Sequence, residues 1–349
     1  MEGEPSATPP AVPALPFAQR ACFVAGPAKS GTTLLVSLLD GHRDLLVLPE
    51  ETAYFPTVLT KYGKRPRREQ VDYLVEQSLA NVLFGNPCKW GKRSYPEFDT
   101  AGLKQRFEAA AFDPANAQRD LLVLLFESYA ATIDLPLDSV VRWVEKTPAN
   151  RDHLDAILGR FPHAKLILTL RDPRALLAAQ ILLERTRKLR RFSIYLCIKH
   201  WRTAARLALR QKRDPGGVLG EDRMLVVGFR RTLRDPEASM RRVCAFLDIP
   251  YDEVMLRPTK IGLPWAGNSA TEQGFTKVST EPAERWRKFL TEDEIGWVEW
   301  HCRDLMEPLG YEPSLPARRL RHWYKPVRGE TPKEYLKSRL YSWRKWRRS

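Results

Sequence analysis

The sequence predicts an α/β domain with an open parallel β-sheet of about five strands flanked by helices. Two observations lead to this prediction. Short apolar runs bounded by breaker residues recur along the chain, and they are apolar throughout, as expected for parallel strands that are covered on both faces. Helical patterns lie between these runs, and the alternation of strand and helix is typical of a parallel sheet.

The first expected strand is residues 21–26, which ends at glycine, and residues 34–39 continue as a helix. The other expected strands are residues 45–48, 143–144, 165–170 and 224–229. The clearest helix begins at Asp235-Pro236, because aspartate suits the cap and proline the first helical position. Its apolar residues fall on one face: Met240, Val243, Cys244 and Leu247.

We expect three parts along the 349 residues. Residues 1–20, rich in proline and alanine, are expected to form a flexible leader. Residues 21–312 form the α/β domain, and residues 313–349 form a tail that is basic and rich in aromatic residues. There is no internal repeat.

The composition is that of a folded protein, with 43% hydrophobic and 28% charged residues. The five cysteines are widely spaced without a C-x-x-C pair, which favours reduced thiols and makes a cysteine zinc site a poor interpretation. No apolar stretch approaches the roughly 18 residues of a spanning helix, and the start lacks the layout of a secretory signal. We therefore expect a cytoplasmic protein.

Positive charge is concentrated near the C-terminus. Residues 317–349 hold 12 lysines and arginines against two acidic residues, so this segment carries +10 of the net charge of +15. A basic tail usually has an electrostatic partner such as a phosphate, an anionic lipid or a nucleic acid. Two further basic clusters lie at residues 61–68 and 185–213.

A candidate anion-binding loop follows the first strand. Residues 26–33 read Gly-Pro-Ala-Lys-Ser-Gly-Thr-Thr and lead into a helix. Free backbone N–H groups and the helix dipole converge at such a turn, which attracts an anion. The alternative is an ordinary glycine-containing turn between strand and helix.

The loop departs from the pattern of ATP- and GTP-binding proteins, G-x-x-x-x-G-K-[ST]. Gly26, Gly31 and Thr33 fit this pattern, but Thr32 stands at the lysine position and the lysine comes earlier, at Lys29. Because that lysine normally reaches the β- and γ-phosphates, nucleoside triphosphate hydrolysis is a weak interpretation. A different anion is indicated.

The loop resembles that of the sulfotransferases, of the carbohydrate and bacterial type, that use 3′-phosphoadenosine 5′-phosphosulfate (PAPS). The resemblance implies that Lys29 contacts the bridging oxygen and stabilises the departing phosphate. It also implies that Ser30, Gly31, Thr32 and Thr33 hold the 5′-phosphate through backbone and hydroxyl donors.

Residues 165–175, Lys-Leu-Ile-Leu-Thr-Leu-Arg-Asp-Pro-Arg-Ala, resemble the strand and turn that bind the 3′-phosphate in the same family. Arg171 at the end of a buried strand can meet a phosphate with a charge-assisted pair of hydrogen bonds. The alternative is that Arg171 pairs with Asp172 or another acid. The family usually has serine eight residues after this arginine, where this chain has Ala179.

Three further segments extend the resemblance over residues 20–311. They are residues 144–148 with 161–165, residues 224–251, and residues 265–269 with 284–288. In the last of these, Arg285 is a candidate second contact for the 3′-phosphate, and Trp286 is a candidate to stack on adenine, although it can equally bury one face of a helix. Where the family often has Tyr-Glu-Asp, this chain has Phe-Arg-Arg at residues 229–231.

The candidate catalytic base is Glu51, which matches a family glutamate three residues before an aromatic pair. Its neighbour Glu50 is the alternative, and both could be solvated loop acids. Ala53 stands where the family has a histidine. Lys146 matches a family lysine that neutralises charge near the base and the sulfonate, with a salt bridge to Glu145 as the alternative.

The predicted function is transfer of the sulfuryl group of PAPS to a hydroxyl, or an amine, of a carbohydrate, lipid or small metabolite. No metal is expected, since the sequence offers no evident set of metal ligands. One alternative is a non-catalytic relative that binds phosphoadenosine or a polyanion, and another is a nucleotide kinase. Retention of Lys29, Glu51 and Lys146 favours the enzyme, because a binding module needs no base.

The tail alternates aromatic and cationic residues between Tyr335 and Trp346. A helix there would carry aromatics and leucines on one side and cations on another, as in a helix that lies on an anionic membrane surface. Packing of those aromatics on the body of the protein is the alternative. Nucleic acid is not expected as a partner.

Overall fold

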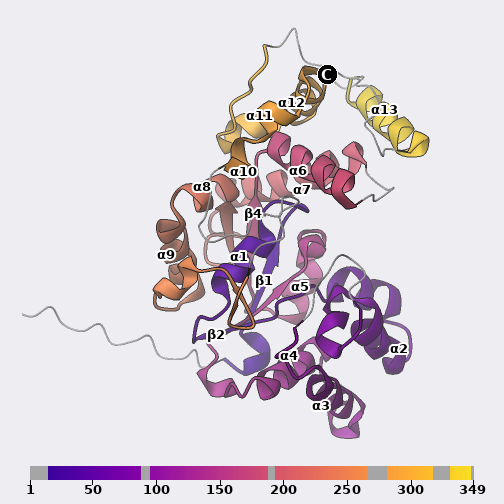
Figure 1. Ribbon diagram of the computed structural model, residues 1–349, viewed down its shortest axis with the longest axis vertical. Helices are drawn as coiled ribbons and strands as arrows, with labels where there is room; N and C mark the ends of the chain where they lie inside the picture. Colours follow the sequence, from indigo (N-terminus) through magenta and orange to yellow (C-terminus); the bar gives the residue numbers. More distant parts are fainter. Residues whose placement is uncertain (1–14, 88–94, 188–192, 266–280, 317–330, 347–349) are drawn as a thin grey trace, which may run out of the picture. The chain divides into compact units, whose positions relative to one another are not determined.

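The computed structural model describes residues 15–87, 95–187, 193–265, 281–316 and 331–346. Its principal sheet has five strands in the order β2-β3-β1-β4-β5 (Figure 1). The strands are β1 (Ala21–Ala25), β2 (Leu45–Val47), β3 (Arg142–Lys146), β4 (Lys165–Leu170) and β5 (Met224–Gly228). Each of the five predicted strands is present, and the predicted α/β class is confirmed.

Parallel pairing follows from the segments between the strands, each of which contains a helix. In the β2–β3 pair Leu46 lies opposite Trp143, and in the β4–β5 pair Leu168 lies opposite Val226. Every residue of β1, β2 and β3 is buried. The prediction from the uniformly apolar runs is therefore confirmed: side chains on both faces of these strands are covered.

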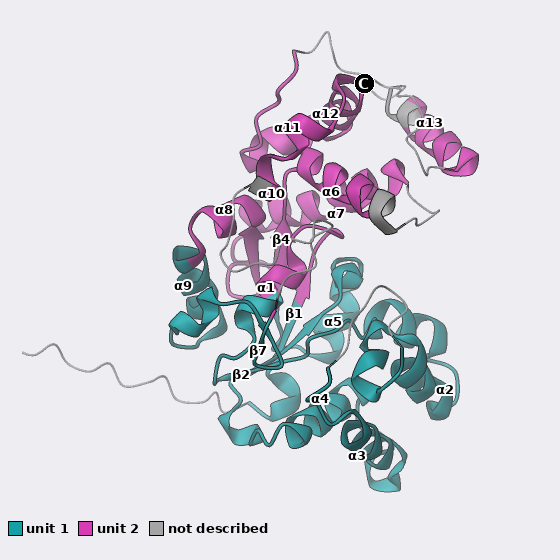
Figure 2. Cartoon of the chain, viewed as in Figure 1, with its two compact units in different colours: residues 1–23, 36–165, 237–264 teal, residues 24–35, 166–236, 265–349 magenta. Residues whose placement is uncertain are grey.

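Residue packing divides the chain into two compact units (Figure 2). Unit 1 comprises residues 1–23, 36–165 and 237–264, and unit 2 comprises residues 24–35, 166–236 and 265–349. The division passes through β1 and through α1 (Thr32–Leu39). The three sequence parts, 1–20, 21–312 and 313–349, stay a prediction.

Unit 1 holds β2, β3 and a small antiparallel hairpin of β6 (Thr259–Lys260) and β7 (Leu263–Pro264). Its α-helices are α2 (Arg67–Asp72), α3 (Thr100–Phe112), α4 (Leu121–Thr132), α5 (Leu154–Arg160) and α9 (Pro236–Leu247). Two π-helices, η2 (Tyr54–Tyr62) and η3 (Tyr73–Gln77), accompany the 3₁₀ turns η1 (Phe17–Gln19), η4 (Leu79–Phe84), η5 (Pro114–Asn116), η6 (Leu137–Ser139), η7 (Pro148–Asp152) and η8 (Glu253–Leu256). Helix α9 begins at the predicted proline, and all four predicted apolar residues of its inner face are buried.

An aromatic cluster forms the centre of unit 1. Trp143 on β3 is fully buried, and its ring centroid lies 5.5 Å from Phe23, 4.6 Å from Phe126 and 5.4 Å from Phe161. Edge and tilted ring contacts of this kind add to the free energy of burial. The cluster holds β3 in place, and β3 ends at Lys146.

Unit 2 holds β4 and β5 and the helices that follow them. These are α6 (Pro173–Arg187), α7 (Ile194–Arg213), α8 (Phe229–Arg234), α10 (Glu281–Glu284), α11 (Trp286–Phe289), α12 (Glu292–Met306), the 3₁₀ turn η9 (Glu307–Leu309) and α13 (Pro332–Trp346). Helix α12 begins with a capping box between Thr291 and Glu294. Of the basic clusters, residues 61–68 lie within the described chain, whereas residues 188–192 of the second cluster lie outside it.

Helix α13 is the helical part of the tail among the described residues. Tyr341 stacks on His301 of α12 and makes an edge contact with Tyr195 of α7, each with ring centroids 5.0 Å apart. One face of the tail helix therefore packs on unit 2, as the packing alternative predicts. The opposite face is exposed, with Leu336 at 60% and Trp343 at 46%.

The thiols of Cys22, Cys197, Cys244 and Cys302 are buried and unpaired with one another. Burial raises the pKa of Cys22 to about 12 and that of Cys244 to about 11. Cys88 lies outside the described residues. Among the described helices, none has the length and apolar character to cross a membrane.

We expect Trp143→Ala to lower the free energy of unfolding by about 3–5 kcal/mol, because it removes the centre of the aromatic cluster and leaves a cavity. Urea denaturation followed by circular dichroism measures the change. Val218→Ala is the control, since Val218 is 69% exposed and its truncation should cost less than about 0.5 kcal/mol. Equal stability of the two variants would contradict the assignment of this core.

Candidate functional site

The loop between β1 and α1 contains three residues with positive φ, of which Gly26 has φ 156°. Lys29 has φ 69° and Gly31 has φ 101°. A left-handed conformation is strained for lysine, so contacts must hold it. One such contact is a hydrogen bond of 2.9 Å from Arg171 Nη1 to the carbonyl oxygen of Lys29. Thr32 and Thr33 open α1, and N–H groups in a first helical turn have no partner within the helix, so this backbone can receive an anion.

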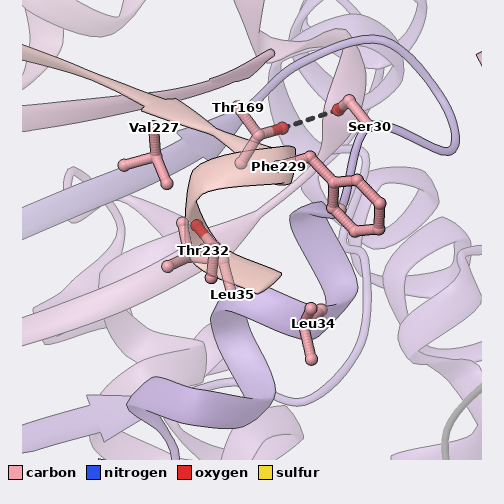
Figure 3. Close-up of a pocket in the computed structure, with 8 residues that line it drawn as sticks. Ser30, Leu34, Leu35, Thr169, Val227, Phe229 and Thr232 are labelled. Carbon is pink, nitrogen blue, oxygen red and sulfur yellow. Dashed lines mark hydrogen bonds between the residues drawn. The ribbon is translucent and has the colours of Figure 1, made fainter. Parts of the chain in front are cut away.

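Close packing explains both glycines of the loop. A Cβ atom on Gly26 would lie 2.3 Å from Oγ1 of Thr169, and one on Gly31 would lie 2.4 Å from the ring of Phe229. The hydroxyls of Ser30 and Thr169 form a buried hydrogen bond of 2.6 Å, which Figure 3 draws. This bond fastens the loop to β4. Because a hydroxyl can donate one hydrogen bond and accept two, the contact of Ser30 with the 5′-phosphate stays a prediction.

A pocket of about 200 Å³ lies beside the loop (Figure 3). It is lined by Ser30, Gly31, Leu34, Leu35, Thr169, Val227, Phe229 and Thr232. Its volume is below that of ordinary ligand sites, about 300–1,000 Å³, and its lining is largely apolar. The pocket is thus smaller than an ordinary site for an organic ligand.

Arg171 is buried directly after β4, with 8% of its surface exposed. The pKa of its guanidinium is lowered to about 10, chiefly by desolvation; the carboxylate of Asp172 opposes this shift, and the positive charge of Arg285 adds to it. The guanidinium carbon lies 4.3 Å from the centroid of Phe229. Among the described residues, Nε of Arg171 has no hydrogen-bond partner. A buried cation with an unused donor, beside a second cation, is suited to an anionic ligand.

The alternative partner of Arg171, Asp172, forms a hydrogen bond of 2.7 Å with Arg174. Arg174 also donates to Glu299, a fully buried carboxylate on α12. The remaining terminal nitrogen of Arg171 donates to the carbonyl oxygen of Pro282. Arg171 therefore links the Lys29 loop to α10, while Asp172 serves Arg174.

Trp286 is 2% exposed, and its ring lies 4.1 Å from the guanidinium carbon of Arg174 and 4.5 Å from that of Arg287. Two guanidinium groups, that of buried Arg174 and that of exposed Arg287, thus lie close to the ring that is a candidate to stack on adenine. The burial of Trp286 agrees with the other interpretation, in which this residue covers one face of a helix, and stacking on adenine stays a prediction. The rest of the family block, residues 266–269, lies outside the described residues.

In unit 1, the structure brings Glu51 and Lys146 together. Nζ of Lys146 donates to Oε1 of Glu51 over 2.6 Å, and the two side chains are 2% and 24% exposed, respectively. Lys146 is the last residue of β3, and Glu51 lies in the loop after β2. A salt bridge between Lys146 and Glu145 was the alternative, and Glu145 has other partners.

Glu145 is buried and is the centre of a hydrogen-bond network, here called the Glu145 hub, next to this pair. Its Oε1 accepts hydrogen bonds from the hydroxyls of Thr52 (2.7 Å) and Thr147 (2.6 Å), and its Oε2 accepts one from Asn150 (2.6 Å). Thr147 in turn accepts a hydrogen bond from the amide of Ala53, which has φ 51°. Because Thr52 follows Glu51 and Thr147 follows Lys146, the hub fixes the backbone on both sides of the ion pair.

Glu50 is not a solvated acid. Its side chain is 1% exposed and forms a salt bridge of 2.7 Å with Lys260 on β6. The hydroxyl of Tyr95 donates to the same oxygen over 2.6 Å. Glu50 thus ties the β6–β7 hairpin to the loop after β2, which leaves Glu51 as the more exposed carboxylate of the two.

Sequence reasoning missed the Glu145 hub and Lys260. The Thr-Pro that follows Lys146 and the threonine after Glu51 were the available signals for the hub, since short hydroxyl side chains beside a buried acid are suited to bond it. Lys260 gave no local signal. Within the described part of the chain, no group of three or more His, Cys, Asp or Glu side chains could hold a metal ion.

Comparison with known proteins identifies the family. The profile of the sulfotransferase family matches residues 22–253, about two thirds of the chain. The chain therefore belongs to the sulfotransferase family, a family of enzymes that generally use PAPS. The predicted family and enzyme class are confirmed.

Two relatives are protein-tyrosine sulfotransferases. That of Drosophila melanogaster is 23% identical over 305 residues, which cover 83% of this chain and 51% of that protein. Protein-tyrosine sulfotransferase A of Caenorhabditis elegans is 23% identical over 299 residues, covering 84% of this chain and 67% of that protein. The chain thus spans about half the length of the first relative.

Among solved structures, the chain resembles a sulfotransferase domain from the curacin biosynthetic pathway. The TM-score is 0.50 at 18% sequence identity, covering 84% of this chain and 98% of that domain. At this identity the likeness concerns the fold alone. It agrees with the five-stranded parallel sheet described above.

Glu145 generates a prediction for the pH dependence of stability. Burial raises the pKa of Glu145 above its ordinary value of 4.5. Because its pKa is higher in the folded state, the folded protein binds the proton of Glu145 more tightly than the unfolded chain does. This contribution to the free energy of unfolding is complete below pH 4.5. It is lost as the pH rises through the pKa of the folded state. Glutamine does not titrate, so the stability of wild type relative to Glu145→Gln should fall with rising pH.

Urea denaturation of both proteins from about pH 4 to about pH 8 measures this difference. Glu76→Gln is the matched control, because Glu76 is exposed and its difference curve should be nearly flat. A difference for Glu145→Gln that stays constant or rises with pH would contradict the raised pKa.

Proposed function

We propose that the chain transfers the sulfuryl group of PAPS to a hydroxyl group of an acceptor. The observation that carries this proposal is the hydrogen bond between Arg171 and the carbonyl oxygen of Lys29. It joins the two residues that the family resemblance assigns to the two ends of PAPS. A nucleotide kinase is disfavoured, because Lys29 comes before Gly31, whereas the lysine of the ATP- and GTP-binding pattern directly follows this glycine.

The residues of unit 2 fit PAPS. The buried Nε of Arg171 lacks a partner among the described residues, and Arg285 adds a second positive charge near it. We assign this pair to the 3′-phosphate. The amides of Gly31, Thr32 and Thr33 are assigned to the 5′-phosphate, together with the hydroxyls of the two threonines.

PAPS, when bound, supplies an activated sulfuryl group whose acceptor is a nucleophilic oxygen. The carboxylate of Glu51 takes the proton of the acceptor hydroxyl as the oxygen–sulfur bond forms. Lys146 orients this carboxylate through their 2.6 Å hydrogen bond. The ammonium group of Lys29 would stabilise the negative charge that the departing phosphate gains when its bond to sulfur breaks.

The ion pair of Glu51 and Lys146 supports the enzyme over a non-catalytic relative. Glu145 is buried and spends its hydrogen bonds on Thr52, Thr147 and Asn150, all beside this pair. A module that only binds phosphoadenosine has no use for a carboxylate held in this way. The non-catalytic alternative would leave the arrangement without a chemical role.

The proposed acceptor is a hydroxyl, or an amine, of a carbohydrate, lipid or small metabolite. A second candidate is the phenol of a tyrosine in a protein, because two relatives that align with more than 80% of this chain are protein-tyrosine sulfotransferases. A phenol, with a pKa near about 10, makes a smaller demand on the base than an alcohol does. Transfer of radiolabelled sulfate from PAPS to a panel of sugars, lipids and tyrosine peptides distinguishes these acceptors.

Cytoplasmic location and the absence of a nucleic-acid partner stay predictions.

Glu51→Gln should lower kcat by about 10²- to 10⁴-fold, because a positioned general base contributes about that factor. The affinity for 3′-phosphoadenosine 5′-phosphate (PAP), measured by calorimetry, should change by less than about twofold, because Glu51 is proposed to contact the acceptor and not PAP. A twofold change corresponds to about 0.4 kcal/mol, which is less than the loss of one typical hydrogen bond. Glu76→Gln serves as the control with unchanged kcat. If Glu51→Gln keeps wild-type kcat, Glu51 is not the base.

Arg171→Met should weaken PAP binding by about 10- to 150-fold, the range expected for a lost charge-assisted hydrogen bond. Binding of AMP, which lacks the 3′-phosphate, should change little by comparison. Calorimetry with both ligands gives the ratio of the two affinities, and Arg213→Met, at an exposed arginine on α7, is the control. An equal loss for PAP and AMP would indicate that Arg171 only supports the loop.

A further inference from the structure

Helix α13 has an apolar face whose side chains are exposed among the residues that the structure describes. Figure 2 shows the helix at the periphery of unit 2. Its inner face carries Tyr341, which contacts His301 and Tyr195, and Ser338, which is fully buried. A helix packed in this way normally presents a polar outer face.

The outer face of α13 is apolar instead. Leu336, Leu340 and Trp343 are exposed by 60%, 49% and 46%. Their spacing of four and three residues places them in one stripe along the helix, about opposite Ser338 and Tyr341 at 100° per residue. Of the seven large hydrophobic side chains that are exposed among the described residues, three lie in this stripe.

Basic residues border the stripe on both sides. At 100° per residue, Arg339 falls on one side of the stripe, and Lys333 and Lys337 fall on the other. All three are exposed. Glu334 is the single acidic residue of α13, and it forms a salt bridge with Lys337. The segment from residue 317 onward carries a net charge of +10.

We propose that α13 docks the protein on an anionic lipid surface, with Leu336, Leu340 and Trp343 entering the boundary between headgroups and acyl chains. An apolar stripe with cations along both edges is the arrangement of helices that lie in the plane of a membrane interface. Lysine and arginine near such a surface are attracted by anionic headgroups. The helix lies on the surface and does not span it.

Charge and composition favour lipid over the other occupants of an apolar face. A second copy of this chain would bring a helix of the same positive charge against the first, which is unfavourable. Single-stranded nucleic acid binds through stacked aromatic rings, whereas two of the three side chains in the stripe are leucines. An anionic lipid surface satisfies both the apolar stripe and its basic borders.

Flotation of the full chain with vesicles tests this proposal. The protein should float with vesicles of phosphatidylcholine and phosphatidylserine, and about tenfold less with phosphatidylcholine alone. Raising the salt to about 1 M should release it, because screening weakens attraction between exposed charges. Equal binding to both kinds of vesicle, or binding to neither, overturns the proposal.

Variants locate the contact. Leu336→Gln/Leu340→Gln should lower the partition onto anionic vesicles by about tenfold or more, given the apolar surface of two leucines. Val218→Gln is the matched control, since Val218 is an aliphatic residue with 69% exposure outside α13, and it should float as wild type does. Circular dichroism melting verifies that each variant is folded. Wild-type flotation of the double variant overturns the proposal.

Light scattering without lipid distinguishes the second copy as occupant. The protein should have the same mass before and after the leucine substitutions. A dimer that dissociates in Leu336→Gln/Leu340→Gln would assign the stripe to self-association and overturn the lipid proposal.

Discussion

The conformation of the loop after β1 depends on one buried cation. Lys29 adopts a left-handed backbone that lysine does not favour, and Arg171 holds its carbonyl oxygen from the end of β4. The same guanidinium packs on Phe229, which in turn fills the space that a side chain on residue 31 would need. Burying a guanidinium group is costly unless it is bonded. The conformation of the loop, the position of the Phe229 ring and the burial of Arg171 therefore depend on one another.

Unit 1 uses the same principle with the opposite charge. Glu145 is a fully buried carboxylate whose hydrogen bonds come from Thr52, Thr147 and Asn150. In each unit a buried ionic group, Arg171 or Glu145, thus orders the backbone beside a residue of proposed function. Lys29 and Glu51, which are proposed to act on PAPS and on the acceptor, are both more exposed than the buried groups Arg171 and Glu145.

The strands could be predicted from the sequence, and the hydrogen-bond networks could not. A strand such as β4 is a local apolar run, so its bounds, Lys165–Leu170, follow from neighbouring residues alone. The partners of the site residues are distant: Thr52 and Glu145 are 93 residues apart, and Glu50 and Lys260 are 210 apart. Residue type gave the pairing of Glu51 with Lys146 only through the family resemblance. The sequence likewise does not reveal that the hydroxyl of Ser30 lies 2.6 Å from that of Thr169 on β4.

The contact between Gly31 and Phe229 has a consequence for how this loop can evolve. A methyl group at residue 31 would meet the ring at 2.4 Å, and a backbone with φ 101° disfavours any side chain there. Exchanging the ring for a smaller one relieves the first obstacle and leaves the second. A single substitution of Gly31 is thus opposed by two separate constraints. Substitutions at residue 229 and its neighbours are therefore expected to accumulate in related sequences while the glycine is retained.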